Sequence, residues 1–163
     1  MKNVLRILAC ALGLMSLGTA AYANPPVAPL AGLTGSWRVT VTTYNCSTLV
    51  ANPSFKSYVT FNFDGTMTET TSAPMFQPGQ RSSGHGYWER AGRNFFHAVS
   101  EAFIQFSTAP PLPPLKRGYQ RIEQGIEFTD HNHFTSDATA TFFDDAGVVV
   151  VSLCASATGE RMD

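Results

Sequence analysis

The chain has 163 residues, of which 11 are basic and 12 acidic, for a net charge of −1. This balance lacks the excess of positive charge that binding to nucleic acid requires, so we expect no nucleic-acid partner. A chain of this length suffices for one domain with one ordinary hydrophobic core.

Residues 1–23 have the three parts of a secretory signal. Lys2 and Arg6 precede an apolar stretch, and Ala21-Tyr22-Ala23 matches the small-residue pattern of a cleavage site. The apolar stretch is shorter than the roughly 20 residues that span a bilayer, and no later segment is long enough. We therefore expect cleavage after Ala23 and a mature chain without a transmembrane anchor, located in the periplasm or outside the cell.

Cleavage leaves an irregular, Pro-rich lead-in over residues 24–33 and a single domain over residues 34–163. The mature chain keeps two cysteines, Cys46 and Cys154. An even pair of cysteines in an exported chain indicates a disulfide, because the compartment is oxidising.

After the lead-in, apolar and polar residues alternate with the two-residue period of β-strands, and no segment holds a helical apolar repeat. The runs that show this pattern are 36–44, 57–63, 66–72, 84–90, 94–106, 118–129, 133–143 and 148–158. Most of them are joined by short turns such as Asp64-Gly65, which favours an antiparallel meander.

A disulfide between Cys46, just past the first run, and Cys154, in the last, requires the first and last strands to be neighbours. Closing the meander satisfies this and removes both exposed sheet edges. We therefore predict an all-β fold, an eight-stranded antiparallel up-and-down β-barrel, with a differently connected β-sandwich as the alternative. Barrels of this size are either filled by side chains or hold one small ligand.

The first strand opens with Gly35-Ser36-Trp37, which resembles the Gly-x-Trp signature of lipocalins and their calycin relatives. Further segments resemble secreted bacterial lipocalin-like domains: Phe61-x-Phe63-Asp64-Gly65-Thr66, 84–90 and 143–147. The resemblance implies a lipocalin-like (calycin-type) barrel in which a late arginine packs across the tryptophan. Arg161 is the candidate, since placing Cys46 opposite Cys154 brings Trp37 near residue 163.

Apolar strand faces are expected to point inward, and small residues among them (Ala138, Ala140, Gly84 and Gly86) favour a pocket over a packed interior. The predicted interior row consists of Trp37, Val39, Val41, Val59, Phe61, Phe63, Ile122, Ile126, Phe128, Phe134, Ala138, Ala140 and Phe142. The expected ligand is a small hydrophobic molecule with a few polar contacts. The candidate ligand-binding residues are Phe61, Phe63, Tyr87, Trp88, Phe103, Gln120, Ile122, Gln124 and Phe142.

An enzyme resembling barrel-fold cyclases or isomerases is the alternative, and it depends on which row of residues 84–90 faces inward. An inward row of His85, Tyr87 and Glu89, joined by His97 and Glu101, would bring together groups suited to acid–base chemistry. The opposite row places Trp88 on the wall instead. A shift of one residue exchanges the two faces, so the sequence leaves both open, together with a packed structural or interaction module.

No cofactor is expected, because phosphate-loop and dinucleotide-binding motifs are absent from the sequence. Residues 130–133 contain His131 and His133, but a third ligand at a telling spacing is missing. We interpret this segment as a polar hairpin turn and expect no metal.

Overall fold

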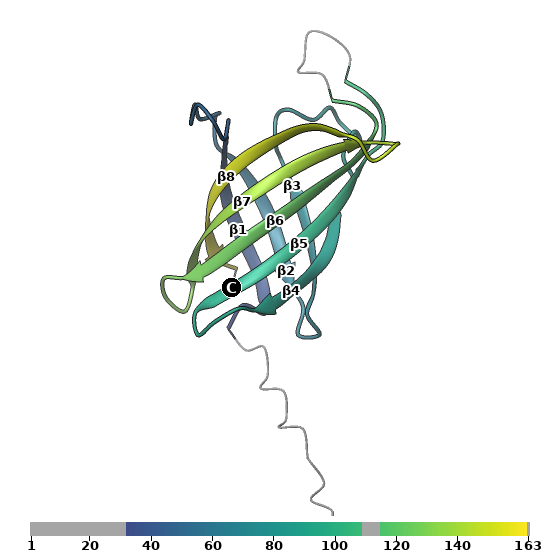
Figure 1. Cartoon of the computed structure of the whole chain (residues 1–163). Coiled ribbons are helices and arrows are strands. Elements are labelled where there is room, and N and C mark those ends of the chain that lie inside the picture. Colours follow the sequence, from purple (N-terminus) through teal and green to yellow (C-terminus); the bar gives the residue numbers. More distant parts are fainter. Residues whose placement is uncertain (1–31, 109–114, 163) are drawn as a thin grey trace, which may run out of the picture.

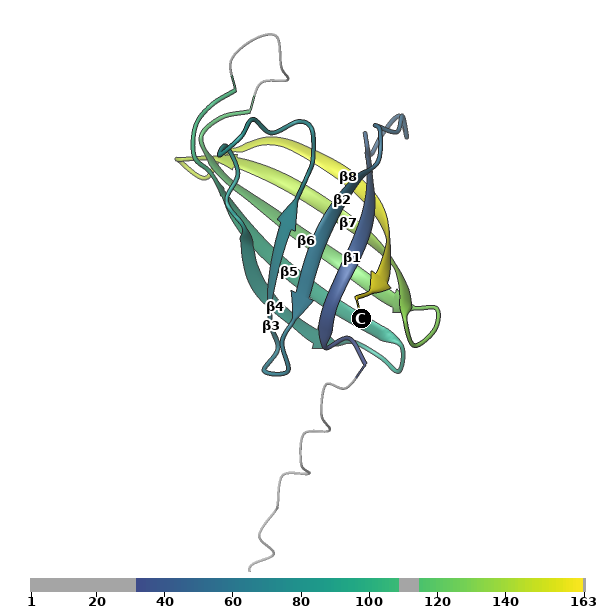
Figure 2. The ribbon, with the colours of Figure 1, turned by 180° about the vertical axis from the view of Figure 1, so that it is seen from behind.

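A computed structural model of the protein describes residues 32–108 and 115–162, and the signal segment 1–23 and lead-in residues 24–31 lie outside them. The described residues form a closed barrel in which each strand pairs antiparallel with its neighbours in chain order (Figures 1 and 2). The predicted all-β, up-and-down barrel is confirmed. Its strands are β1 (Gly35–Tyr44), β2 (Phe55–Phe61), β3 (Thr66–Thr71), β4 (Gly84–Arg90), β5 (Phe95–Ile104), β6 (Gly118–Phe128), β7 (His133–Asp144) and β8 (Val149–Arg161).

The strands differ from their sequence-based boundaries by up to three residues, and β2 and β8 differ most. β2 ends at Phe61, because Asn62 already begins the turn to β3, with its N–H donating to the carbonyl of Thr66. β8 continues to Arg161, because it pairs with β1 along the whole length between Tyr44 and Trp37.

The barrel closes through pairing of β1 with β8, and the predicted disulfide lies at one end of this seam. Tyr44 is opposite Cys154, so Cys46 reaches it from the loop beyond β1, with 5.1 Å between the two Cα atoms. The predicted register, with Cys46 directly opposite Cys154, was wrong by two residues because Cys46 is not itself in the strand. The correct register places Trp37 directly opposite Arg161.

The end of the barrel where β1 begins is closed by a packed core, which we call the closed-end cluster. Its buried members are Leu33, Trp37, Val39, Val59, Phe61, Met67, Trp88, Phe96, Ala98, Ile126 and Phe134. The Arg161 guanidinium lies 4.2 Å from the Trp37 ring centre, and its Nη1 donates to the carbonyl oxygen of Thr34 at 2.8 Å. The arginine expected from the lipocalin resemblance therefore occupies that position.

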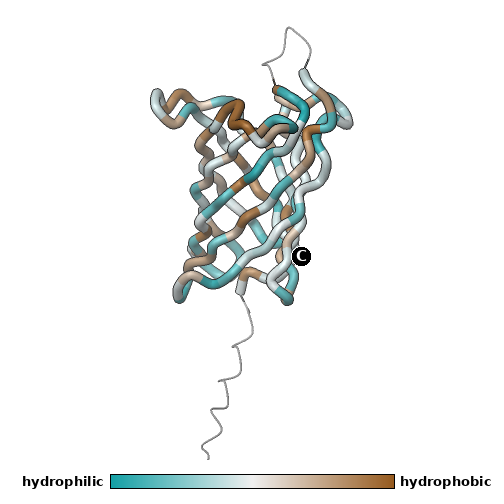
Figure 3. Tube along the Cα trace, turned by 45° about the vertical axis from the view of Figure 1, so that its right-hand side comes forward, coloured by the Kyte–Doolittle hydropathy of each residue, from teal (hydrophilic) through white to brown (hydrophobic). Residues whose placement is uncertain are grey.

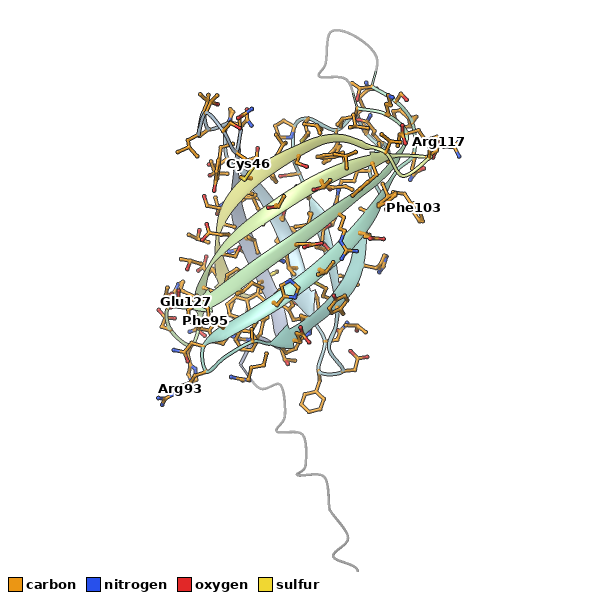
Figure 4. All side chains as sticks on the ribbon, in the orientation of Figure 1. Cys46, Arg93, Phe95, Phe103, Arg117 and Glu127 are labelled. Carbon is orange, nitrogen blue, oxygen red and sulfur yellow. A yellow bond between two sulfur atoms is a disulfide. The ribbon has the colours of Figure 1, made fainter. Side chains whose placement is uncertain are left out.

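The alternation of hydropathy follows from this arrangement, because inward and outward residues alternate along every strand. Figure 3 shows hydrophobic positions recurring along the strands and again in loops at the end opposite the closed-end cluster. Cys46 lies at that second end, far from the turn that carries Arg93 (Figure 4). We call the end of the barrel opposite the closed-end cluster the open end.

The β2–β3 turn at the closed end gives a test by titration. Hydrogen bonds from the hydroxyl of Thr66, at 2.6 Å, and from its backbone N–H, at 2.9 Å, lower the pKa of Asp64 from its usual 3.8. Replacing Thr66 by valine is expected to raise this pKa towards 3.8 without fully restoring it, since the backbone donor remains. Carboxyl NMR titration measures the shift.

The sign for stability follows from the lowered pKa. At a pH above the pKa that Asp64 has in the unfolded chain, its ionised carboxylate stabilises the folded state. This stabilisation is lost as the pH falls through the lower pKa of Asp64 in the folded protein. In the Thr66→Val variant, we expect a smaller loss of stability as the pH is lowered through this range. Thr68→Val, at the next outward position of β3, is the control, and an equal shift of the Asp64 pKa there would contradict the assignment.

Candidate functional site

Above the closed-end cluster the barrel is hollow, and the space has two adjoining parts. The inner hollow has a volume of about 90 Å³ and is lined by side chains of every strand but β4, together with the loop that follows β3. The outer hollow has a volume of about 570 Å³ and lies at the open end. The two share the lining residues Thr43, Phe55, Ala73, Met75 and Leu153, so the inner hollow lies directly beside the outer one.

The outer hollow is mainly apolar. It is formed by the loops after β1 and β3, by Leu115 and by the first residues of β8. Its other lining residues are Asn52, Pro53, Pro74, Val150 and Val151. Such a mouth offers an apolar molecule a route from solvent to the barrel interior.

A buried ion pair lies in the wall of the inner hollow. Glu69 points inward from β3, and Arg81 reaches it from the loop between β3 and β4, with only 7% and 4% of the two side chains exposed. Both Nη atoms of the Arg81 guanidinium donate to the Glu69 carboxylate. Nη1 also donates to the carbonyl oxygen of Ser82 at 3.1 Å, and Nε donates to the side-chain oxygen of Gln120 at 2.6 Å. The Arg81 guanidinium is therefore held by three residues: Glu69, Ser82 and Gln120.

The loop that carries Arg81 is fixed by the neighbouring Gln80, which is fully buried. The amide nitrogen of Gln80 donates to the carbonyl of Phe106 at 3.0 Å and to the hydroxyl of Thr108 at 2.8 Å. Its side-chain oxygen accepts the backbone N–H of Gln77 at 3.0 Å. These bonds join the β3–β4 loop to the segment after β5, so that Arg81 is directed into the barrel.

Inward polar residues form a ring on the floor of the hollow, which we call the polar belt. Each of its members lies two residues from a member of the closed-end cluster along the same strand, so all five face inward at a similar depth. The members are Ser57, Glu69, Ser100, Gln124 and Ser136.

The uncharged members of the polar belt keep their hydrogen-bonding capacity. Within residues 32–108 and 115–162, the side chains of Ser57, Ser100, Gln124 and Ser136 form no hydrogen bond to another residue. Every fully enclosed side-chain nitrogen or oxygen in these ranges does have a partner. The polar atoms of these four side chains therefore lie at the surface of the hollow.

The room expected beside two glycines of β4 is not part of the hollow. A Cβ on Gly84 would lie 2.2 Å from the Glu69 carboxylate, and one on Gly86 would lie 1.8 Å from the carbonyl oxygen of Val99. Gly84 thus makes space for the buried carboxylate, and Gly86 lets β4 and β5 approach closely. The hollow instead owes its space to small residues such as Ala138 and Ala140.

The candidate ligand-binding residues divide into three groups. Gln120, Ile122, Gln124 and Phe142 line the inner hollow. Phe61 and Trp88 belong to the closed-end cluster. Phe63, Tyr87 and Phe103 are exposed on the outside, because Phe63 lies beyond the end of β2 and the other two occupy the outward rows of their strands. Figure 4 shows Phe103 projecting away from the barrel.

The five residues of the acid–base alternative lie on the outer face of β4 and β5. The inward row of β4 contains Gly84, Gly86 and Trp88, so His85, Tyr87 and Glu89 point to solvent. Nδ1 of His97 lies 3.8 Å from a carboxylate oxygen of Glu89, where His97 is partly and Glu89 largely exposed, and Glu101 pairs with Arg121. None of the five lines the hollow.

The turn over residues 130–133 is polar and exposed, as interpreted. Oδ1 of Asp130 lies 2.8 Å from Nδ1 of His133, and the same carboxylate accepts the backbone N–H of Asn132. In the part of the chain that the structure describes, no three metal-binding side chains gather closely enough to hold a metal ion.

Sequence reasoning missed Glu69, Arg81 and the serines of the polar belt. The alternation of Met67, Glu69 and Thr71 in a threonine-rich run places Glu69 on an inward row, but nothing local distinguishes that row from the outward one. Arg81 lies in a loop, where no periodicity indicates direction. Its burial depends on partners in β3 and β6 that are far away in the sequence.

Together, the fold and the hollow define a single-chain, eight-stranded antiparallel β-barrel that is closed at one end and open to an apolar cavity at the other. No protein-family model matches the chain, and no curated protein matches it in sequence. Over residues 32–108 and 115–162, no helix has the length and apolar character needed to cross a membrane.

Proposed function

We propose that this protein is a secreted, lipocalin-like barrel that binds a small hydrophobic molecule in its interior. The observation that carries the proposal is the pair of adjoining hollows between the apolar mouth and the polar belt. The outer part, of about 570 Å³, falls within the range of roughly 300–1,000 Å³ that is typical of small-molecule sites.

The same proposal includes export of the chain after cleavage following Ala23. Its support is the disulfide between Cys46 and Cys154, which is compatible with a periplasmic or extracellular location.

Uptake of a hydrophobic fluorescent probe by the mature chain, residues 24–163, tests the binding function. N-phenyl-1-naphthylamine is uncharged and fluoresces strongly in apolar surroundings, so we expect a saturable, blue-shifted signal. A signal no greater than that of the unfolded chain would contradict the proposal.

Filling the hollow is expected to abolish most of this uptake. Ala138 lines the inner hollow, and Ala138→Phe places a ring in the space that the probe would occupy. We expect probe affinity to fall by about tenfold or more, which corresponds to about 1.4 kcal/mol. The dissociation constant from a fluorescence titration measures this.

The matched control is Thr139→Phe, one residue further along β7, where the side chain is exposed on the outer face. It adds the same ring to the same strand without entering the hollow. Equal losses of affinity in both variants would show that the probe binds elsewhere.

A further inference from the structure

We infer that the polar end of the ligand is uncharged: the interior selects an apolar molecule that ends in a hydroxyl, carbonyl or amide group over the same molecule ending in a carboxylate or an ammonium. This inference rests on the proposed function and names the class of ligand that the same site accepts. It follows from the charges, the hydrogen-bonding groups and the order of the layers inside the barrel.

The interior has two charged side chains, and they neutralise each other. Among the described residues that line the inner hollow, Glu69 and Arg81 alone carry charge, and they form the buried ion pair. The outer hollow is lined by no charged side chain in the described residues. A charged group on a ligand would therefore lose its hydration without gaining a free counter-charge, which is costly in an apolar site.

The guanidinium of Arg81 is also already engaged. Both Nη atoms contact Glu69, Nη1 also donates to the carbonyl of Ser82, and Nε is taken by Gln120. A ligand carboxylate would have to displace Glu69 to obtain a two-point contact with this arginine. The displaced carboxylate would then be buried without its partner.

Uncharged partners are available in the polar belt. The hydroxyls of Ser57, Ser100 and Ser136 each donate and accept, and the Gln124 amide offers both donors and an acceptor. They come from β2, β5, β6 and β7, so they surround the floor of the hollow rather than occupying one wall. One hydroxyl or carbonyl group at this depth meets hydrogen-bonding partners from several directions.

The order of the layers sets the orientation of the ligand. The closed-end cluster lies below the polar belt, and the apolar walls of the inner and outer hollows lie above it. A ligand bound with its polar end at the belt leaves its apolar body against residues such as Ile122, Phe142 and Leu153. The site therefore fits an amphiphile with a single small, neutral head.

The test compares three molecules that share a ten-carbon chain: 1-decanol, decanoate and decylammonium, at pH 7.5. Each competes with N-phenyl-1-naphthylamine on the mature wild-type protein. We expect 1-decanol to displace the probe about tenfold more tightly than either charged compound, a ratio that corresponds to 1.4 kcal/mol. Decanoate or decylammonium binding as tightly as the alcohol would overturn the inference while leaving the proposed function intact.

A charge variant separates the role of the ion pair from the ordinary hydration of an anion. Glu69→Gln keeps the shape of the side chain but leaves the Arg81 charge unbalanced, so we expect the preference to shift towards decanoate by about tenfold or more. Glu101→Gln, which removes the same charge from the outer face, is the control and should leave the preference unchanged. An unchanged preference in Glu69→Gln would overturn the inference.

A second variant keeps the inference testable if Glu69→Gln does not fold. Ser100→Ala/Ser136→Ala removes two hydroxyls of the polar belt and leaves the ion pair in place. We expect the affinity for 1-decanol to fall by about fivefold, the effect of about 1 kcal/mol for a hydrogen bond. No change would overturn the inference, whereas failure of the wild type to take up the probe and all three compounds would overturn the proposed function itself.

Discussion

Replacing Cys46 and Cys154 by serine is expected to lower the free energy of unfolding by about 4–5 kcal/mol in the chain-entropy account of disulfides. The bond joins positions separated by 108 residues, so it restricts most of the unfolded chain. β1 and β8 are also joined by backbone pairing from Trp37 to Tyr44, so we expect the variant still to fold. Urea denaturation followed by tryptophan fluorescence measures the loss.

The wild-type protein treated with a thiol reductant is the matched control, because it lacks the bond but keeps both cysteine side chains. The reduced protein and the double-serine variant should unfold at the same urea concentration, well below that of the oxidised protein. A double-serine variant as stable as the oxidised wild type would show that the bond does not secure the closure of the barrel.

The closure that this prediction tests is also the part of the fold that the sequence indicated best. Alternating strands are local signals, and the cysteine pair adds the one long-range constraint that brings the first and last strands together. The register of that seam was wrong by two residues, because a cysteine just past a strand does not show which strand residue lies opposite its partner; Tyr44, and not Cys46, is opposite Cys154.

The orientation of β4 and the interior of the site were harder to predict, for a physical reason. Both rows of residues 84–90 contain groups suited to a binding site, and the choice between them depends on contacts with other strands. Trp88 packs against Phe61 and Phe96, and Gly84 makes room for Glu69. These contacts join positions far apart in the chain, so no local pattern records them.

Removing one member of the buried ion pair is expected to destabilise the barrel strongly. Glu69→Ala leaves the Arg81 charge without its partner, and Arg81→Ala does the same to Glu69; each is expected to cost about 3–5 kcal/mol. Both side chains are almost completely enclosed, so water cannot replace the lost partner fully. Thermal and urea unfolding of the two single variants measure the cost.

A double replacement and a surface pair distinguish an unpaired charge from simple loss of packing. Glu69→Leu/Arg81→Met removes both charges and retains much of the volume, so its loss should be well below the sum of the two single losses. Glu101→Ala breaks the exposed pair with Arg121 and should cost no more than about 1 kcal/mol. If the double replacement instead costs as much as the two single losses combined, the charges do not act as a pair.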